Sequence, residues 1–226
     1  MLMKKLLSTL VFVFCCFIVS GQDQSLYSRF DEIVGQNNTK LSYGSVYKEK
    51  YRKKIKDNHN FYLTDSFKKG SVNYRGEQFD NVDIKYDLVD DFIIIKLNNQ
   101  QQQISIIPQK NLITKFSIGN IKFRNSDTDG FLEELLVKDN FAVLKKHRKV
   151  SKENRDADYR YHTFKKREQH ILFYNNSYYP IDSKRGFTRL FPEKKKQISK
   201  FYKSNTYLLK NDYKTFVAKL ISLLQE

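Results

Sequence analysis

The feature that most constrains the fold is a series of short β-type runs, separated by turn residues, that begins near residue 43 and ends near residue 182. Val82, Ile84 and Tyr86 alternate with polar residues, as in a strand with one buried face. Runs at such short spacing leave no room for crossover helices, so they predict an antiparallel meander and exclude βαβ units. The candidate strands are residues 71–75, 78–86, 91–97, 102–107, 112–118, 121–124, 131–137, 141–149, 158–166, 169–174 and 177–182.

Glycine and asparagine mark the expected hairpin turns, because both residues tolerate positive φ. The turns fall at residues 75–77, 98–99, 139–140 and 175–176. Residues 92–95 are continuously apolar, which is typical of a strand in the middle of a sheet. These features predict a mainly β, α+β fold: a large twisted antiparallel meander that could curl into a half-barrel.

Helical periodicity appears at both ends of the chain. Residues 23–36 carry one apolar face and end near Gly35, which predicts a short N-terminal helix. Pro192 can start a second helix, and Asn211 or Asp212 can cap a third. This last helix has the strongest apolar stripe in the chain, which predicts burial against the sheet. We therefore expect a single β-rich domain over residues 23–226, with a helical segment at about 192–225.

The first 22 residues have the pattern of a cleavable signal peptide. Lys4 and Lys5 precede an uncharged run over residues 6–19, and Ser20 and Gly21 are small residues at the expected cleavage site. The run is short for a membrane span, although a retained anchor remains an alternative. We expect cleavage after Gly21 or Gln22 and a periplasmic or secreted protein.

Both cysteines of the chain, Cys15 and Cys16, lie inside this uncharged run. The mature chain would therefore contain no cysteine. Disulfides, thiol nucleophiles and cysteine-ligated zinc are excluded for it on this interpretation.

Loose motifs occur at residues 70–82, 85–87, 90–91, 130–131, 133–135, 144–146 and in the helical tail 199–224. Together they resemble a group of uncharacterised exported proteins of Bacteroidota. The resemblance covers most of residues 43–224. It implies export and a β-rich fold, and no activity accompanies it.

Two acidic motifs are weak candidates for a cation site. Residues 125–130 resemble the start of an EF-hand loop with Asp127 and Asp129, but Leu136 stands where the bidentate acid is needed. Asp87, Asp90 and Asp91 lie within one predicted turn, where they could hold a cation or act as an acid/base pair. A solvated turn, with Asp87 capping a backbone N–H, is the favoured interpretation, so we expect no metal or cofactor.

Motifs for common catalytic chemistries are missing from the sequence. No pair of its four histidines has the i, i+4 spacing of a helical zinc site, although His162 and His170 could face each other across a hairpin. No serine sits in a G-x-S-x-G elbow, and Gly-x-Gly does not occur. We therefore expect a protein that is not an enzyme.

The charge balance favours anionic partners. Lys and Arg number 41 against 25 Asp and Glu, and removing residues 1–22 leaves a formal charge of +14. A compositional bias toward lysine is the competing explanation. If the charge is functional, basic residues on neighbouring strands should form one continuous patch. Its expected members are Lys145, Lys146, Arg148, Lys149, Arg160, Lys165, Lys166 and Arg167.

Three functions follow from these observations. The first is a non-catalytic envelope module for binding or scaffolding, with a lipid headgroup or glycan as its anionic partner. The second is a carrier that holds a lipid-like ligand in a cavity of the curled sheet. The third is a hydrolase that uses the three clustered aspartates. Nucleic acid is a poor partner for an exported protein, although aromatic residues interleave with the basic runs.

Overall fold

The computed structural model describes residues 39–98 and 103–225, and within these ranges it shows one open antiparallel sheet of eleven strands. The mainly β fold expected from the sequence is therefore confirmed. The strands are β1 (Gly44–Val46), β2 (Lys68–Tyr74), β3 (Glu77–Asp87), β4 (Phe92–Asn98), β5 (Gln103–Pro108), β6 (Ile113–Ile118), β7 (Ile121–Ser126), β8 (Gly130–Val137), β9 (Phe141–Arg155), β10 (Arg160–Tyr174) and β11 (Ser177–Pro180).

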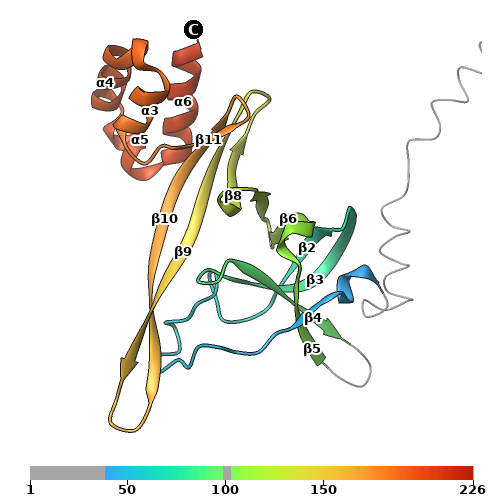
Figure 1. Cartoon of the computed structure of the whole chain (residues 1–226). Helices are drawn as coiled ribbons and strands as arrows, with labels where there is room; N and C mark the ends of the chain where they lie inside the picture. Colours follow the sequence, from blue (N-terminus) through green and yellow to red (C-terminus); the bar gives the residue numbers. More distant parts are fainter. Residues whose placement is uncertain (1–38, 99–102, 226) are drawn as a thin grey trace, which may run out of the picture.

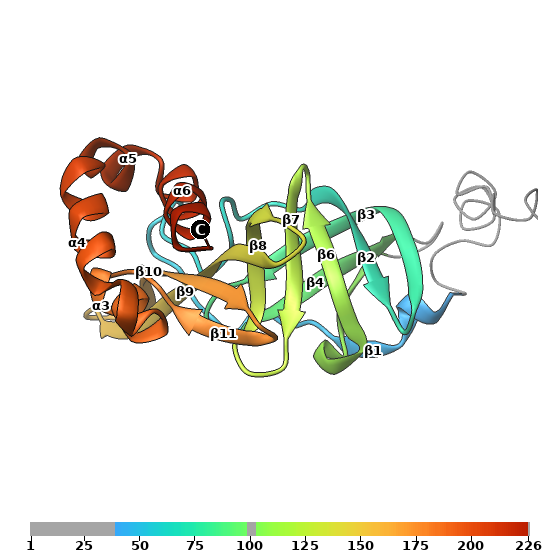
Figure 2. The ribbon, with the colours of Figure 1, turned by 90° about the horizontal axis from the view of Figure 1, so that it is seen from above.

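The strand order across the sheet is β1-β5-β4-β3-β2-β6-β7-β8-β9-β10-β11. Strands β2 to β5 form one meander, which extends across the sheet to one side of β2. Strands β6 to β11 form a second meander, which extends to the other side of β2. The two meanders join where β6 pairs with β2, after the short 3-10 turn η3 (Lys110–Leu112). Figure 2 shows how the sheet curls, and side chains from β3, β4, β6, β7 and β8 share one core inside the curl.

Turn chemistry explains two of the tight hairpins. Arg75 and Gly76, between β2 and β3, have φ values of 54° and 79°. Asn175 and Asn176, between β10 and β11, have φ values of 47° and 58°. Two consecutive residues with positive φ define the hairpin turn whose twist matches that of paired strands. The turns expected at these positions are confirmed, whereas Asn99 lies outside the described residues.

The prediction of separate strands at 158–166 and 169–174 is wrong, because both belong to the single strand β10. This strand pairs with β9 over fifteen residues, from Arg160 opposite Arg155 to Tyr174 opposite Phe141. The sequence suggested a break because residues 165–169 are polar on both faces. His162 and His170 consequently share one strand and do not face each other across a hairpin.

The C-terminal segment contains four helices: α3 (Lys184–Leu190), α4 (Lys195–Ser204), α5 (Thr206–Asn211) and α6 (Tyr213–Gln225). The 3-10 turn η4 (Pro192–Lys194) leads into α4, and the Asp212 carboxylate accepts the backbone N–H of Thr215 as the cap of α6. Helices α3 and α5 were not expected from the sequence. The predicted helix at 23–36 and the signal peptide at 1–22 lie outside the described residues.

The helices pack at one end of the β9–β10 pair (Figure 1). Leu220, Ile221 and Phe216 of α6 are fully buried with Phe187 of α3 and Leu172 of β10 in a second hydrophobic core. The predicted burial of the α6 stripe is confirmed. Among the described residues, no helix is long and apolar enough to cross a membrane.

Candidate functional site

The candidate site lies on the β9–β10 ribbon, where most of the expected basic patch is found. Arg148 is directly opposite Arg167, and Lys149 is directly opposite Lys166. Because side chains alternate along a strand, these two pairs project from opposite faces of the ribbon. We call the face that carries Lys149 and Lys166 the covered face, and the face that carries Arg148 and Arg167 the open face.

Residues 47–67, which we call the strap, pack against the covered face around Phe164. Tyr51 of the strap packs edge-on against Phe164, with ring centroids 5.4 Å apart. The Asn58 side chain accepts the backbone N–H of Phe164 at 2.7 Å and donates to the carbonyl of the same residue at 3.0 Å. The strap therefore completes the hydrogen bonding of this strand much as a neighbouring strand would.

Lys149 ties the ribbon to the strap. Its Nζ donates to the carbonyl oxygens of His59 at 2.6 Å and Phe61 at 2.9 Å. Burial lowers the pKa of Lys149, and the nearby charge of Lys166 adds to this effect. Lys149 is thus a structural donor and is not part of an exposed patch.

The other expected cations of the covered face have acidic partners. Lys166 Nζ lies 2.8 Å from Glu168, and Lys145 Nζ lies 3.8 Å from the same carboxylate. Arg160 lies 3.3 Å from Glu153. These partners compensate part of the positive charge locally.

His147, also on the covered face, is a buried group whose environment the sequence did not reveal. Its Nε2 hydrogen-bonds Glu133 on β8, and its Nδ1 lies 3.2 Å from a Glu168 oxygen. Burial opposes ionisation of Glu133, but the hydrogen bond with His147 prevails and holds the pKa of this carboxyl below its usual value. Tyr62 packs edge-on against the imidazole with centroids 5.0 Å apart. This packing encloses the ring, so we assign the group to cross-strand stabilisation.

Lys146 points to the open face but is only 2% exposed. Its Nζ lies 2.8 Å from Asp91 and donates to the carbonyl of Phe131 at 3.2 Å. Burial lowers the pKa of Lys146, and Asp91 limits the shift. The eight expected residues therefore do not make one continuous patch. Lys146 is a buried donor, Lys149 is a half-buried donor, and three others lie beside acidic partners.

Four exposed cations remain on the open face, and we call them the basic row. Three were expected, Arg148, Lys165 and Arg167, and the fourth is Lys152. None of the four has an ion-pair partner within the described part of the chain. Lys152 could have been found from the period-2 alternation that starts at Arg148. Like charges directly opposite each other destabilise a strand pair, as Arg148 and Arg167 must do here.

The aspartates of the β3–β4 turn do not form a solvated cluster. Asp87 is 1% exposed, and its carboxylate accepts the backbone N–H groups of Val89 at 2.8 Å and Asp90 at 3.1 Å together with the Asn60 side chain. Burial raises the pKa of Asp87 despite these hydrogen bonds. The expected capping role is correct, but the expected exposure is wrong for this residue.

Asp91 and Asp90 face other partners. Asp91 receives the Tyr86 hydroxyl and the ammonium groups of Lys110 and Lys146. Burial opposes ionisation of Asp91, but Lys146 and Lys110 together hold the pKa of this carboxyl below its usual value. Asp90 pairs with Lys50 at 3.1 Å and accepts the Tyr51 hydroxyl. Each carboxylate is thus occupied by its own set of donors.

Asp127 and Asp129 lie in the β7–β8 turn. The Asp129 carboxylate accepts the Thr128 hydroxyl at 2.9 Å, and the Asp129 backbone N–H lies 3.3 Å from the Ser126 hydroxyl. The Asn125 amide group donates to the carbonyls of Lys110 and Ile113. No group of three or more possible metal-binding side chains is found among the described residues. The turn is held by its own hydrogen bonds.

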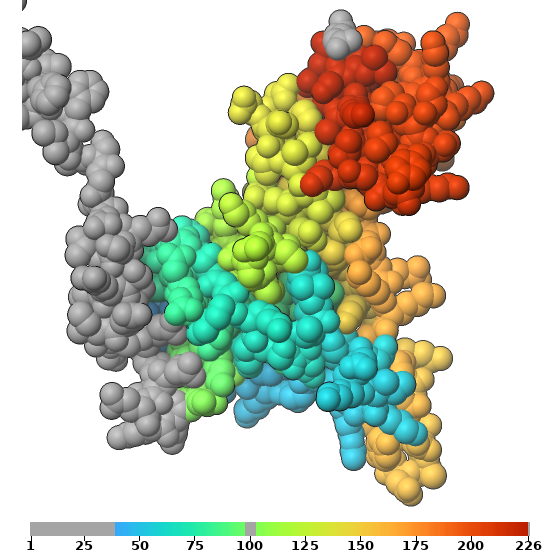
Figure 3. Space-filling model, turned by 180° about the vertical axis from the view of Figure 1, so that it is seen from behind, coloured from blue at the N-terminus to red at the C-terminus, as the bar shows by residue number. Residues whose placement is uncertain are grey.

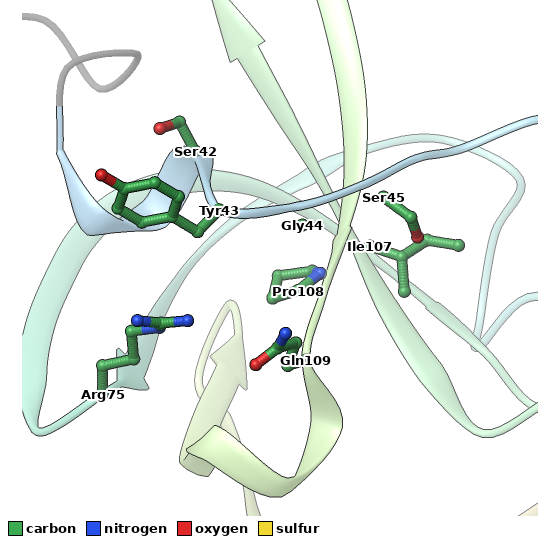
Figure 4. Close-up of a pocket in the computed structure, with 8 residues that line it drawn as sticks. All are labelled: Ser42, Tyr43, Gly44, Ser45, Arg75, Ile107, Pro108 and Gln109. Atoms are coloured by element: carbon green, nitrogen blue, oxygen red, sulfur yellow. The ribbon is translucent and has the colours of Figure 1, made fainter.

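A shallow pocket of about 490 Å³ lies at the β1 edge of the sheet (Figure 4). The Arg75 guanidinium reaches over the ring of Tyr43, with 5.3 Å to its centroid, and makes no ion pair among the described residues. Pro108 and Gln109 form the opposite wall. The pocket could accept one small acidic group, and the sequence did not reveal it because three separate segments build it.

Comparison with protein-family models, with curated proteins and with solved structures finds no match to this chain. The case for a function therefore rests on the geometry of the ribbon.

Proposed function

We propose that this protein is a non-catalytic binding or scaffold module of the bacterial envelope, which engages an anionic partner through the basic row. The observation that carries the proposal is the pairing of Arg148 with Arg167 across two strands, where neither residue forms an ion pair within the described residues. Each guanidinium offers a planar fork of donors that suits phosphate or carboxylate. An acidic group bound between them would relieve their repulsion.

The location and the class of partner belong to the same proposal. The signal-peptide pattern of residues 1–22 supports export, and export makes an acidic envelope component the natural partner. Lipid headgroups and acidic surface glycans both present phosphate or carboxylate groups. The basic row recognises this shared chemistry.

The two alternative functions receive less support. Phe116 and Phe123 stack with centroids 4.6 Å apart in the curled sheet, and Tyr86 and Phe131 pack against Phe116. These rings fill the space that a lipid-like ligand would need in this part of the core. A hydrolase would require Asp87, Asp90 and Asp91 to converge on a substrate, whereas each is held by different donors.

We expect the variant Arg148→Glu/Lys165→Glu/Arg167→Glu to bind anionic partners about a hundredfold more weakly than the wild type, since each basic residue contributes about 1 kcal/mol near an anionic surface. The measurement is binding to an acidic polysaccharide and to glycerol 3-phosphate, a soluble molecule with the phosphate chemistry of a lipid headgroup. Binding should weaken steeply with salt, because screening at about 0.1 M limits the range of exposed charges to roughly 10 Å.

The matched control is Lys68→Glu/Lys115→Glu/Lys138→Glu, which reverses three exposed lysines elsewhere on the sheet. A loss confined to the polysaccharide would identify a glycan as the partner, and a loss confined to glycerol 3-phosphate would identify lipid headgroups. Equal binding of both probes by the basic-row variant and the wild type would refute the proposal.

A further inference from the structure

The C-terminal helices carry more of the positive charge than their length explains. Residues 183–225, which we call the helical cap, contain eleven basic residues and two acidic ones, for a formal charge of +9. Residues 39–182 are more than three times as long and carry +8. The basic residues of the cap are Lys184, Arg185, Arg189, Lys194, Lys195, Lys196, Lys200, Lys203, Lys210, Lys214 and Lys219.

The cap differs from the sheet in how its charges are compensated. Lysines of the sheet and the strap are repeatedly paired, as Lys53 is with Asp65 and Lys110 with Asp91. None of the eleven basic residues of the cap forms an ion pair within the described residues. One of the two acids, Asp212, is used to cap α6. The positive field of the cap is thus left open to solvent.

The apolar faces of the cap helices are already used inside the protein. Ile198 of α4 and Phe187 of α3 are fully buried, and Tyr202 packs edge-on against Phe216 with centroids 4.8 Å apart. What remains exposed is mainly polar, and lysine is its commonest residue. The cap therefore has no apolar stripe to insert into a lipid phase, and any outer ligand must be held by charge.

Helix α4 concentrates this charge in one place. Lys195, Lys196, Lys200 and Lys203 line, with Ser199, a shallow hollow of about 580 Å³ on its outer side. Like charges three and four positions apart destabilise a helix. None of these lysines forms an ion pair within the described residues, and an external negative surface would stabilise the arrangement.

We propose that the helical cap docks the protein on an anionic bilayer surface through the lysine face of α4. Clusters of four to eight basic residues on a helix are the form in which proteins recognise acidic lipid headgroups. Lysine is a compact, strongly hydrated point charge, so it suits a diffuse surface of headgroups. This docking is distinct from ligand binding by the basic row.

A bilayer fits the α4 face better than a nucleic acid does. Single-stranded nucleic acids are held by aromatic side chains on which bases stack, and no ring lines the α4 hollow. Specific base contacts and phosphate forks favour arginine, which the hollow also lacks. The only large apolar side chain of the cap that is mostly exposed within the described range is Tyr207, on α5.

The position of the cap gives this docking a structural consequence. Figure 1 shows the helices at one end of the β9–β10 ribbon and its hairpin turn at the other, and Figure 2 shows α4 on the side of the cap furthest from β2 and β3. The space-filling view shows the cap projecting beyond the sheet (Figure 3). Fifteen-residue strands span about 50 Å. The basic row, whose Arg148 and Arg167 stand midway along these strands, therefore lies apart from the cap.

The test is cosedimentation of the full mature chain with vesicles that contain phosphatidylglycerol, and with phosphatidylcholine vesicles as the neutral reference. We expect wild-type binding to the acidic vesicles only, and a loss of about a hundredfold in Lys196→Glu/Lys200→Glu/Lys203→Glu. The neutralised variant Lys196→Gln/Lys200→Gln/Lys203→Gln should lose part of the binding. Binding by the sheet control Lys68→Glu/Lys115→Glu/Lys138→Glu should stay close to wild type.

Four outcomes separate the possibilities. If the α4 variants lose vesicle binding and keep wild-type melting temperatures, the proposal is supported. Wild-type levels of vesicle binding by the α4 variants would overturn it, and so would an absence of wild-type binding to acidic vesicles. Tighter binding of a DNA oligonucleotide than of vesicles, lost in the same variants, would assign the face to nucleic acid and also overturn it. Because the basic-row variant leaves α4 unchanged, failure of one proposal does not imply failure of the other.

Discussion

Asp91→Asn should destabilise the protein by about 3–5 kcal/mol, because it leaves the buried ammonium group of Lys146 without a compensating charge. Asparagine is the right replacement, since Asp91 has a φ of 57° and asparagine tolerates this conformation. The measurement is chemical denaturation monitored by circular dichroism. Adding Lys146→Met should restore part of the lost stability by removing the buried charge itself.

The control for this experiment is Asp90→Asn in the same turn. Asp90 pairs with Lys50, whose side chain is 64% exposed, and exposed pairs contribute about 0–1 kcal/mol. A similar loss of unfolding free energy in the two variants would show that the Asp91–Lys146 pair stabilises the fold no more than an exposed ion pair does. A double variant no more stable than Asp91→Asn alone would lead to the same conclusion.

The pKa shift of Asp91 also predicts a dependence on pH. The folded state holds the pKa of this carboxyl below its usual value of about 3.9, so the pair stabilises the fold above that pH. The contribution is lost as the pH falls through the folded pKa. Stability curves of wild type and Asp91→Asn should therefore converge at low pH, which thermal unfolding at a series of pH values would measure.

Leu220→Asp should lower the melting temperature by on the order of 10 °C or more. Leu220 is fully buried in the core of the cap, where truncation of a leucine to alanine alone costs about 2–5 kcal/mol. An aspartate adds the cost of a buried, unpaired charge. Each kcal/mol shifts the midpoint by about 2–4 °C in a domain of this size. Differential scanning calorimetry is the appropriate measurement.

Lys219→Asp, on the exposed side of the same helix, controls for the new charge and for helix propensity. It should change stability by about 0.5 kcal/mol or less. If Leu220→Asp unfolded no earlier than this control, the α6 stripe would not be a core element, and a partner could bind it instead.

Local patterns in the sequence were sufficient for most of the sheet. The alternation at Val82, Ile84 and Tyr86 predicted β3, and the Asn175–Asn176 pair predicted the turn before β11, because these signals act between near neighbours in the chain. The same reliance on near neighbours explains why the sequence predicted two strands in place of β10. Polar residues near Arg167 suggest a break, and only pairing with β9 keeps them extended.

For the site, the sequence alone determined where positive charge is concentrated, and the tertiary structure decided which charges are free. The strap reaches Lys149 from about ninety residues away, through the carbonyls of His59 and Phe61, and turns an apparent patch residue into a half-buried donor. Asp91 likewise removes Lys146 from the exposed patch, because it holds the buried ammonium group in an ion pair. Basic residues occur on both faces of the ribbon, so their positions in the sequence do not tell which face is covered. The packing of a distant segment against one face left the other face, with Arg148 and Arg167, as the candidate site.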